Sequence, residues 1–205
     1  LREGMKVVEG SEGIKRRGVI LKLMMQLKQI CNHPAHFLKE STMKINDSVK
    51  TALLLEIVKQ IYEAEEKAII FTQYTQMGEL LKDFLQATFH TQVPFLHGGL
   101  TRKGRDEAVE IFQSEEHCPF MILSLKAGGT GLNLTSASHV IHFDLWWNPA
   151  VEAQATDRAY RIGQKNNVLV HRMITKGTLE EKINELLQSK KEIADMAIST
   201  NNAWI

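Results

Sequence analysis

Residues 68–96 read AIIFTQYTQMGELLKDFLQATFHTQVPFL, and this stretch decides the fold class. It opens with a short, unbroken apolar run at 68–71, which is typical of a strand buried on both faces. Apolar positions with helical spacing follow at 78–89, and a second short apolar run follows at 93–96. A strand, a helix and a strand in this order form the unit from which parallel sheets are built.

The same alternation continues on both sides of this stretch. Further elements are expected as helices at 49–64 and 102–112 and as strands at 120–123, 140–143 and 168–174. Short strands that alternate with helices predict an α/β domain, with a parallel sheet covered by helices on both faces. Ligands of such sheets bind at the carboxyl ends of the strands, so the loops after the strands are expected to carry the functional side chains.

Amphipathic helices are also predicted outside this core, near both ends of the chain. The first covers residues 14–30, and Pro34 ends it. The last covers residues 178–194, where Thr178 is expected as the N-cap and Glu181 completes a capping box.

A helix that can hold a polyanion is predicted within residues 146–164, which read WWNPAVEAQATDRAYRIGQ. Pro149 suits its first turn and Gly163 suits its end. The two adjacent aromatic side chains of Trp146 and Trp147 cannot both point to one side of a regular element. One of them is therefore expected to pack in the core and the other to face a ligand.

Gln154, Arg158 and Arg161 lie at positions i, i+4 and i+7 of this helix, so they share one face. Arginine offers a planar fork of donors that matches phosphate oxygens, and it stays charged at any ordinary pH. Two arginines one turn apart can therefore grip a phosphate during phosphoryl transfer. The alternative is a surface helix with solvated charges, since a short motif alone is a weak signal.

Six segments, taken in order, resemble the motifs of the Swi/Snf-type ATPases, which are helicase-like DNA translocases of superfamily two. They are QICNHP at 29–34, IIFTQY at 69–74, LHGG at 96–99, LSLKAGGTGLNLT at 123–135, HFD at 142–144 and the stretch at 146–164. The resemblance covers nearly all of the chain and implies a RecA-like second motor lobe. It divides the chain into a linker and helical insertion at 1–40, the lobe at 41–176, and a bracing helix with a tail at 177–205.

The resemblance implies DNA contacts at the carboxyl edge of the sheet. It places Lys126 and Thr130 on a DNA phosphate and Gly131 near the nucleotide, in a Gly-rich loop that by itself is only a tight turn. Thr72 and Gln73 suit phosphate positioning, and a role as strand-end caps stays open beside it. One of Trp146 and Trp147 lies against DNA in the same comparison. Asp144 has no second carboxylate beside it and is interpreted as structural.

The same resemblance implies that ATP binds between this lobe and a first lobe of the same polypeptide. Arg158 and Arg161 would stabilise the transferred charge, with Gln154 supporting them. The sequence has no G-x-x-x-x-G-K-[ST] loop and no Asp-Glu-x-His box, which in the family bind ATP and Mg²⁺ on the first lobe. We therefore expect a DNA-dependent ATPase with double-stranded DNA as its partner, of which this chain alone is inactive.

Two other functions stay open at this stage. The first is an RNA helicase lobe, against which the QICNHP and RIGQ segments argue. The second is a non-catalytic nucleic-acid-binding scaffold, which has no need of Arg158 and Arg161.

Composition limits the remaining classes. The formal net charge of +1 requires any nucleic-acid surface to be a local patch. Cys31 and Cys118 form no C-x-x-C pair, and no apolar run reaches membrane-spanning length, so an intracellular protein is expected, in the cytoplasm or nucleoid of a prokaryote or the nucleus of a eukaryote. Cys31, His33 and His36 resemble metal ligands, but no second pair follows at zinc spacing, so no metal is expected.

Overall fold

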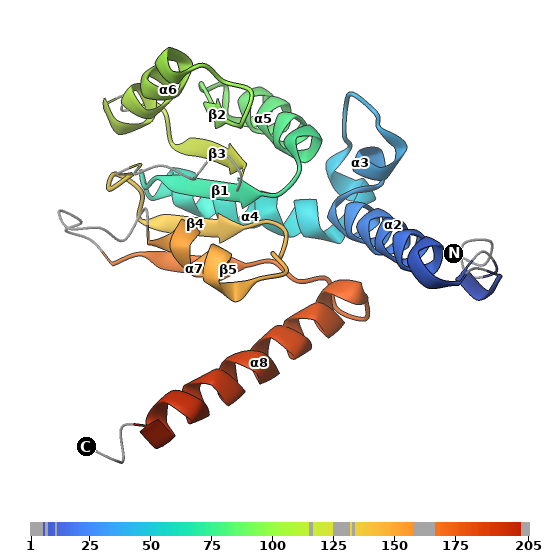
Figure 1. The fold of residues 1–205 in the computed structure, drawn as a ribbon. Coiled ribbons are helices and arrows are strands. Elements are labelled where there is room, and N and C mark those ends of the chain that lie inside the picture. Colours follow the sequence, from blue (N-terminus) through green and yellow to red (C-terminus); the bar gives the residue numbers. More distant parts are fainter. Residues whose placement is uncertain are drawn as a thin grey trace.

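The chain forms a parallel sheet between two layers of helices (Figure 1). The computed structural model describes residues 6, 8–10, 12–114, 117–124, 132, 134–157 and 167–201, with the backbone alone for 191–201. In these residues, no helix is long and apolar enough to cross a membrane.

The sheet has the strand order β2-β3-β1-β4-β5. Its strands are β1 (Ala68–Thr72), β2 (Phe95–Leu96), β3 (Phe120–Ser124), β4 (His139–His142) and β5 (Leu169–Arg172). Every neighbouring pair is parallel, as the alternation of strands and helices predicts. The central strand β1 is buried along its whole length, which explains its unbroken apolar sequence.

Helices cover both faces of the sheet, so the predicted α/β architecture is confirmed. On one face, α4 (Val49–Glu63) and α5 (Thr75–Phe89) pack on side chains such as that of Ile70. On the other face, α6 (Arg102–Ser114) and α7 (Pro149–Thr156) pack on the neighbouring strand positions. Successive strand residues point to opposite faces, so one apolar run supplies both cores.

Two helical segments lie outside this sandwich (Figure 1). The first consists of α2 (Gly13–Asn32) and α3 (Pro34–Leu38), followed by the short 3-10 helix η1 (Ile45–Asp47). The second is α8 (Leu179–Asn201), which reaches away from the sheet and is longer than predicted.

Pro34 both separates and starts a helix. It ends α2 as predicted, and it then occupies the first turn of α3, where a missing N–H costs nothing. The His33 imidazole caps α3, because its Nδ1 accepts a hydrogen bond from the Ala35 N–H at 3.0 Å. His33 Nε2 also hydrogen-bonds the Lys44 carbonyl oxygen at 2.9 Å. These contacts are the packing role that the sequence favoured over metal binding.

The start of α8 differs slightly from the predicted capping box. Thr178 acts as the cap, since its Oγ1 accepts a hydrogen bond from the Glu180 N–H at 3.2 Å. Glu181 does not reach back to Thr178; instead its Oε2 accepts from the Gly177 N–H at 2.9 Å. Gly177 has a φ of 71°, a left-handed conformation that glycine adopts without strain.

Candidate functional site

Asp144 joins the carboxyl ends of β1 and β4. Asp144 is almost fully buried, with only 1% of its surface exposed. One carboxylate oxygen accepts hydrogen bonds from Thr72 Oγ1 at 2.5 Å and from Asn32 Nδ2 at 3.3 Å, and the other accepts from the Gln73 N–H at 3.0 Å. A buried carboxylate with these donors fixes the segments that supply them. The interpretation of Asp144 as a structural residue that orients nearby loops is confirmed.

Thr72 and Gln73, the predicted DNA contacts after β1, have different surroundings. Thr72 is fully buried and its hydroxyl donates to Asp144, so it has the strand-end role that the sequence left open. In this arrangement the Thr72 hydroxyl does not reach the surface. Gln73 is only partly buried, and its Nε2 donates to the Leu145 carbonyl oxygen at 2.7 Å. Gln73 is therefore the member of the pair that lies within reach of a ligand.

The two tryptophans differ in exposure, but neither packs in the core, where one of them was predicted to lie. Trp147 is 42% exposed, whereas Trp146 is partly buried. The Trp146 backbone N–H donates to Glu152 Oε1 at 2.9 Å, which ties this segment to α7. Trp147 is thus the side chain that presents an aromatic surface at the carboxyl edge.

Lys28 contacts the segment of Leu145 and Trp147, and sequence reasoning missed this residue. The residue is 0% exposed, and its Nζ donates to the Leu145 carbonyl oxygen at 2.5 Å and lies 4.8 Å from the centre of the Trp147 ring. Burial lowers the pKa of Lys28, while the negative charges of Asp144 and Glu180 oppose that shift. No local pattern marks this lysine among the basic residues of α2, because its partner lies far away in sequence.

Helix α7 begins as predicted. Pro149 occupies its first turn, and Asn148 caps it by accepting a hydrogen bond from the Ala150 N–H at 3.0 Å. The described helix runs to Thr156, and residues 158–163, over which it was predicted to continue, lie outside the described residues. Gln154 lies exposed on this helix. The two arginines with which it was predicted to share a face lie outside the described residues.

Five of the predicted site residues lie outside the described residues. They are Lys126, Thr130, Gly131, Arg158 and Arg161. Their roles stay predictions. Lys126, Thr130 and Gly131 follow the end of β3 at Ser124 in the sequence, and the two arginines follow the end of α7 at Thr156.

His142 is a buried histidine at the end of β4 that serves the structure. Its Nε2 hydrogen-bonds Thr156 Oγ1 at 3.0 Å, and that hydroxyl donates onward to the Glu152 carbonyl oxygen. The Nε2 of His142 is therefore the donor, and burial lowers the pKa of the imidazole. His142 also stacks on Phe71 across the sheet. It joins α7 to the sheet in its neutral form.

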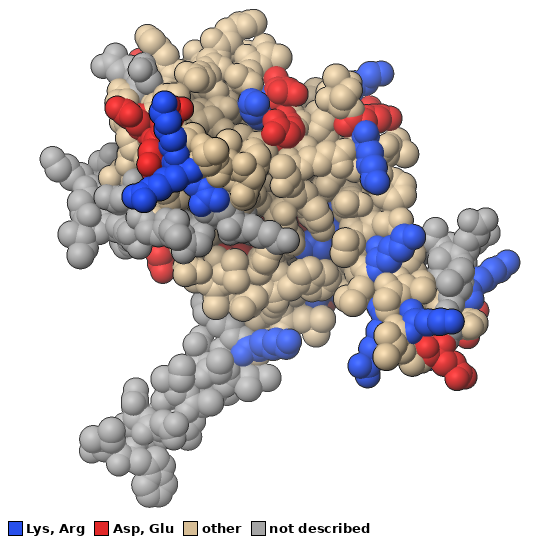
Figure 2. All heavy atoms as spheres, turned by 45° about the horizontal axis from the view of Figure 1, so that its top comes forward, with Lys and Arg blue, Asp and Glu red and all other residues tan. Residues whose placement is uncertain are grey.

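Basic side chains gather at the end of the molecule that α2 forms (Figure 2). Lys15, Arg16, Arg17 and Lys22 are exposed on this helix. They form a local basic patch on a chain whose net charge is only +1.

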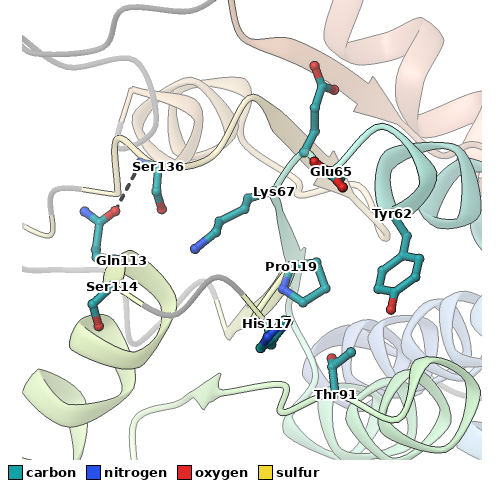
Figure 3. Close-up of a pocket in the computed structure, with 10 residues that line it drawn as sticks. Tyr62, Glu65, Lys67, Thr91, Gln113, Ser114, His117, Pro119 and Ser136 are labelled. Carbon is teal, nitrogen blue, oxygen red and sulfur yellow. Dashed lines mark hydrogen bonds between the residues drawn. The ribbon is translucent and has the colours of Figure 1, made fainter.

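A hollow of about 700 Å³ lies at the opposite edge of the sheet, before β1, β3 and β4 (Figure 3). Its lining includes Tyr62, Lys67, His117 and Ser136. The Ser136 N–H donates to the Gln113 side chain at 3.1 Å, and Lys67 Nζ donates to the Phe112 carbonyl oxygen at 2.8 Å. None of the predicted site residues lines this hollow. The described candidate site residues therefore lie at the carboxyl edge of the sheet and not in this hollow.

The chain is similar to known proteins along most of its length. The family model described as the helicase conserved C-terminal domain matches residues 49–163. A Bacillus subtilis protein named putative ATP-dependent helicase/translocase YwqA is 54% identical over 195 residues, which is 94% of this chain and 21% of that protein. The chain therefore spans about a fifth of that relative.

Solved structures give the same result. The Sulfolobus solfataricus SWI2/SNF2 ATPase core in complex with dsDNA matches with a TM-score of 0.83 and 42% identity, over 99% of this chain and 42% of that one. The C-terminal domain of the Sulfolobus solfataricus SWI2/SNF2 ATPase matches with a TM-score of 0.78 and 41% identity, over 92% of this chain and 76% of that one. At these identities the likeness extends beyond the fold to the family.

Proposed function

This chain belongs to the helicase conserved C-terminal domain family, in its SWI2/SNF2 ATPase branch, and from that premise we propose that it is the second motor lobe of an ATP-dependent DNA translocase. The observation that carries the proposal is its match, along 99% of its length, to a SWI2/SNF2 core solved with duplex DNA. The position of Gln73 and Trp147 at the carboxyl edge of the sheet supports it.

The carboxyl edge would bind the DNA backbone rather than read bases. Gln73 offers an amide and Trp147 an exposed aromatic face, and both lie in segments that follow strands. Amide groups suit contacts to phosphate and sugar, which carry no sequence information. Lys126 and Thr130 would add a cation and a hydroxyl to the same edge. Contacts of this kind hold a duplex without regard to its sequence, which is what a translocase requires.

The nucleotide would bind between this lobe and a first lobe of the longer protein. Arg158 and Arg161 would meet the phosphates from this side, with Gln154 on the adjoining helix α7 and Gly131 near the nucleotide. Mg²⁺ would be held by the first lobe, and when bound it would neutralise charge on the phosphates. Closure of the cleft brings the arginines to the phosphates, and reopening releases them, so turnover can be coupled to movement along DNA.

The proposal is tested first on ATP turnover. The 205-residue chain alone is expected to hydrolyse ATP no faster than a buffer control, because its sequence has no G-x-x-x-x-G-K-[ST] loop. A two-lobed protein in which a first motor lobe precedes this chain should hydrolyse ATP, and duplex DNA should stimulate it. Comparable turnover by the chain alone contradicts the one-lobe proposal. Stronger stimulation by duplex RNA than by duplex DNA would favour the RNA helicase alternative.

DNA binding by the chain alone is expected to be weak, salt-sensitive and independent of sequence. Each neutralised phosphate adds about 0.9 to the slope of log affinity against log salt. Lys126→Ala should therefore lower that slope by roughly 1. Lys59→Ala is the matched control, since Lys59 is exposed on α4, toward the end that leads into the amino end of β1. Titrations of two unrelated duplexes at several salt concentrations measure both effects, and a strong preference for one duplex contradicts the proposal.

A further inference from the structure

Four charged side chains are buried together where α2, α4, α8 and the loop after β4 meet. They are Lys28, Lys50, Asp144 and Glu180, whose residues are 0%, 5%, 1% and 0% exposed. Two are cations and two are anions, so the group is neutral as a whole. Burial lowers the pKa of Lys28, the charges of Asp144 and Glu180 oppose that shift, and the charge of Lys50 adds to it.

A continuous chain of contacts joins Glu180 to Asp144. Both Glu180 carboxylate oxygens accept from Lys50 Nζ at 2.6 Å, and one of them also accepts from the Thr175 N–H at 3.0 Å. Lys50 Nζ reaches Asn32 Oδ1 at 3.4 Å, and Asn32 Nδ2 reaches Asp144 at 3.3 Å. The Asn32 side chain thus accepts from the cation and donates to the anion, which fixes its amide orientation.

This chain of contacts connects segments that are distant in sequence. Glu180 lies in the first turn of α8, and Asn32 ends α2. Asp144 holds the end of β1 and precedes the tryptophan segment, as described above. The first turn of α8 is therefore linked, through Lys50 and Asn32, to the segments that carry Gln73 and Trp147.

Stability alone does not explain such an arrangement. Replacing a buried ion pair by apolar side chains of similar volume is often neutral or stabilising, whereas removing one partner leaves a costly buried charge. A buried ion pair is better explained by a need to hold the two elements that it joins in one relative position. A bidentate pair at 2.6 Å, extended by a side-chain amide, holds α8 in one position relative to the strand ends.

We propose that Glu180 is a positioning residue for DNA binding, which acts through Lys50 and Asn32 to hold the strand-end segments of Gln73 and Trp147 in place. The inference rests on the proposed function, because it concerns the same DNA-binding edge. According to this proposal, the contact between α8 and the rest of the domain affects the affinity for DNA.

The test uses the two-lobed protein, linear duplex DNA and three variants. Glu180→Gln keeps the shape but leaves Lys50 without its anion. The double variant Lys50→Met with Glu180→Leu removes both charges, so that no unpaired charge remains. Glu185→Gln is the matched control, because it breaks the exposed Lys182–Glu185 pair on the same helix. Thermal melting, the half-saturating DNA concentration and the maximal stimulated turnover are measured for each.

We expect Glu180→Gln to lower Tm and to raise the half-saturating DNA concentration roughly threefold to tenfold, the effect of one lost hydrogen-bonded contact. The double variant should recover Tm but keep the raised DNA concentration, since the link to Asn32 is still missing. Glu185→Gln should match the wild type in all three measurements.

A double variant that recovers both Tm and DNA affinity overturns the inference, since the pair then serves stability only. If Glu180→Gln does not fold, the double variant decides the question alone. A wild-type protein without DNA stimulation removes the proposed function and this inference with it. A stimulated wild type whose Glu180 variants keep normal DNA affinity removes the inference only.

Discussion

Arg161→Ala in the two-lobed protein is expected to lower DNA-stimulated ATP turnover by about a thousandfold or more, the usual cost of losing an arginine finger in nucleotide hydrolases. The expectation rests on the position of Arg161 after α7, a helix that begins at the functional edge of the sheet. In the proposed two-lobed protein, the Arg161 side chain would reach a phosphate on the opposite lobe only when the cleft is closed. Its stabilisation then appears mainly in the transition state and raises turnover rather than ground-state affinity.

The variant is informative only beside suitable controls. Arg161→Lys should restore little, because lysine keeps the charge but loses the planar fork. DNA affinity and Tm of Arg161→Ala should stay near those of the wild type, because the proposed role of Arg161 is confined to the phosphates of the nucleotide. Turnover with and without DNA, measured beside a thermal melt, separates these effects. Near-normal stimulated turnover in a well-folded variant would remove Arg161 from the active site.

The sheet could be predicted because its signals are local. The apolar run that opens β1 is continuous because both faces of that strand are buried, and helical spacing in α4 and α5 follows from the single face that each buries. Strand lengths were harder to predict. The expected strand at 93–96 is reduced to β2 (Phe95–Leu96), and Pro94 has no N–H with which to extend the ladder.

The site could be predicted only where a motif marks it. Asp144 follows a strand end, and its structural role could be inferred because no second carboxylate lies beside it in sequence. Lys28, Lys50 and Glu180 could not be selected, because their partners lie 117 and 130 residues away. A lysine within an amphipathic helix is ordinarily solvated, and only the folded structure shows that these two are buried.

Asp144→Asn is expected to destabilise this chain by about 3 kcal/mol or more, the cost of leaving buried charges without their partner. The residue accepts hydrogen bonds from Thr72, Gln73 and Asn32. An asparagine has a single acceptor oxygen, so its NH₂ group must face at least one of these donors. Its loss of charge also leaves Lys28 and Lys50 with Glu180 as the one remaining anion of the buried group. For a chain of this size, Tm should fall by roughly 6–12 °C.

Two further variants show which contact matters. Thr72→Val keeps the charge but removes a hydroxyl that donates to Asp144 and accepts from the Tyr74 N–H at 3.3 Å. It should cost only about 2 kcal/mol, the usual net value of two hydrogen bonds. Asp106→Asn is the matched control, because Asp106 is exposed on α6 and its substitution should change stability by less than about 0.5 kcal/mol. Urea unfolding of the three variants gives the free energies directly. If Asp144→Asn is as stable as Asp106→Asn, the carboxylate does not hold the strand ends together, and the position of Gln73 and Trp147 needs another cause.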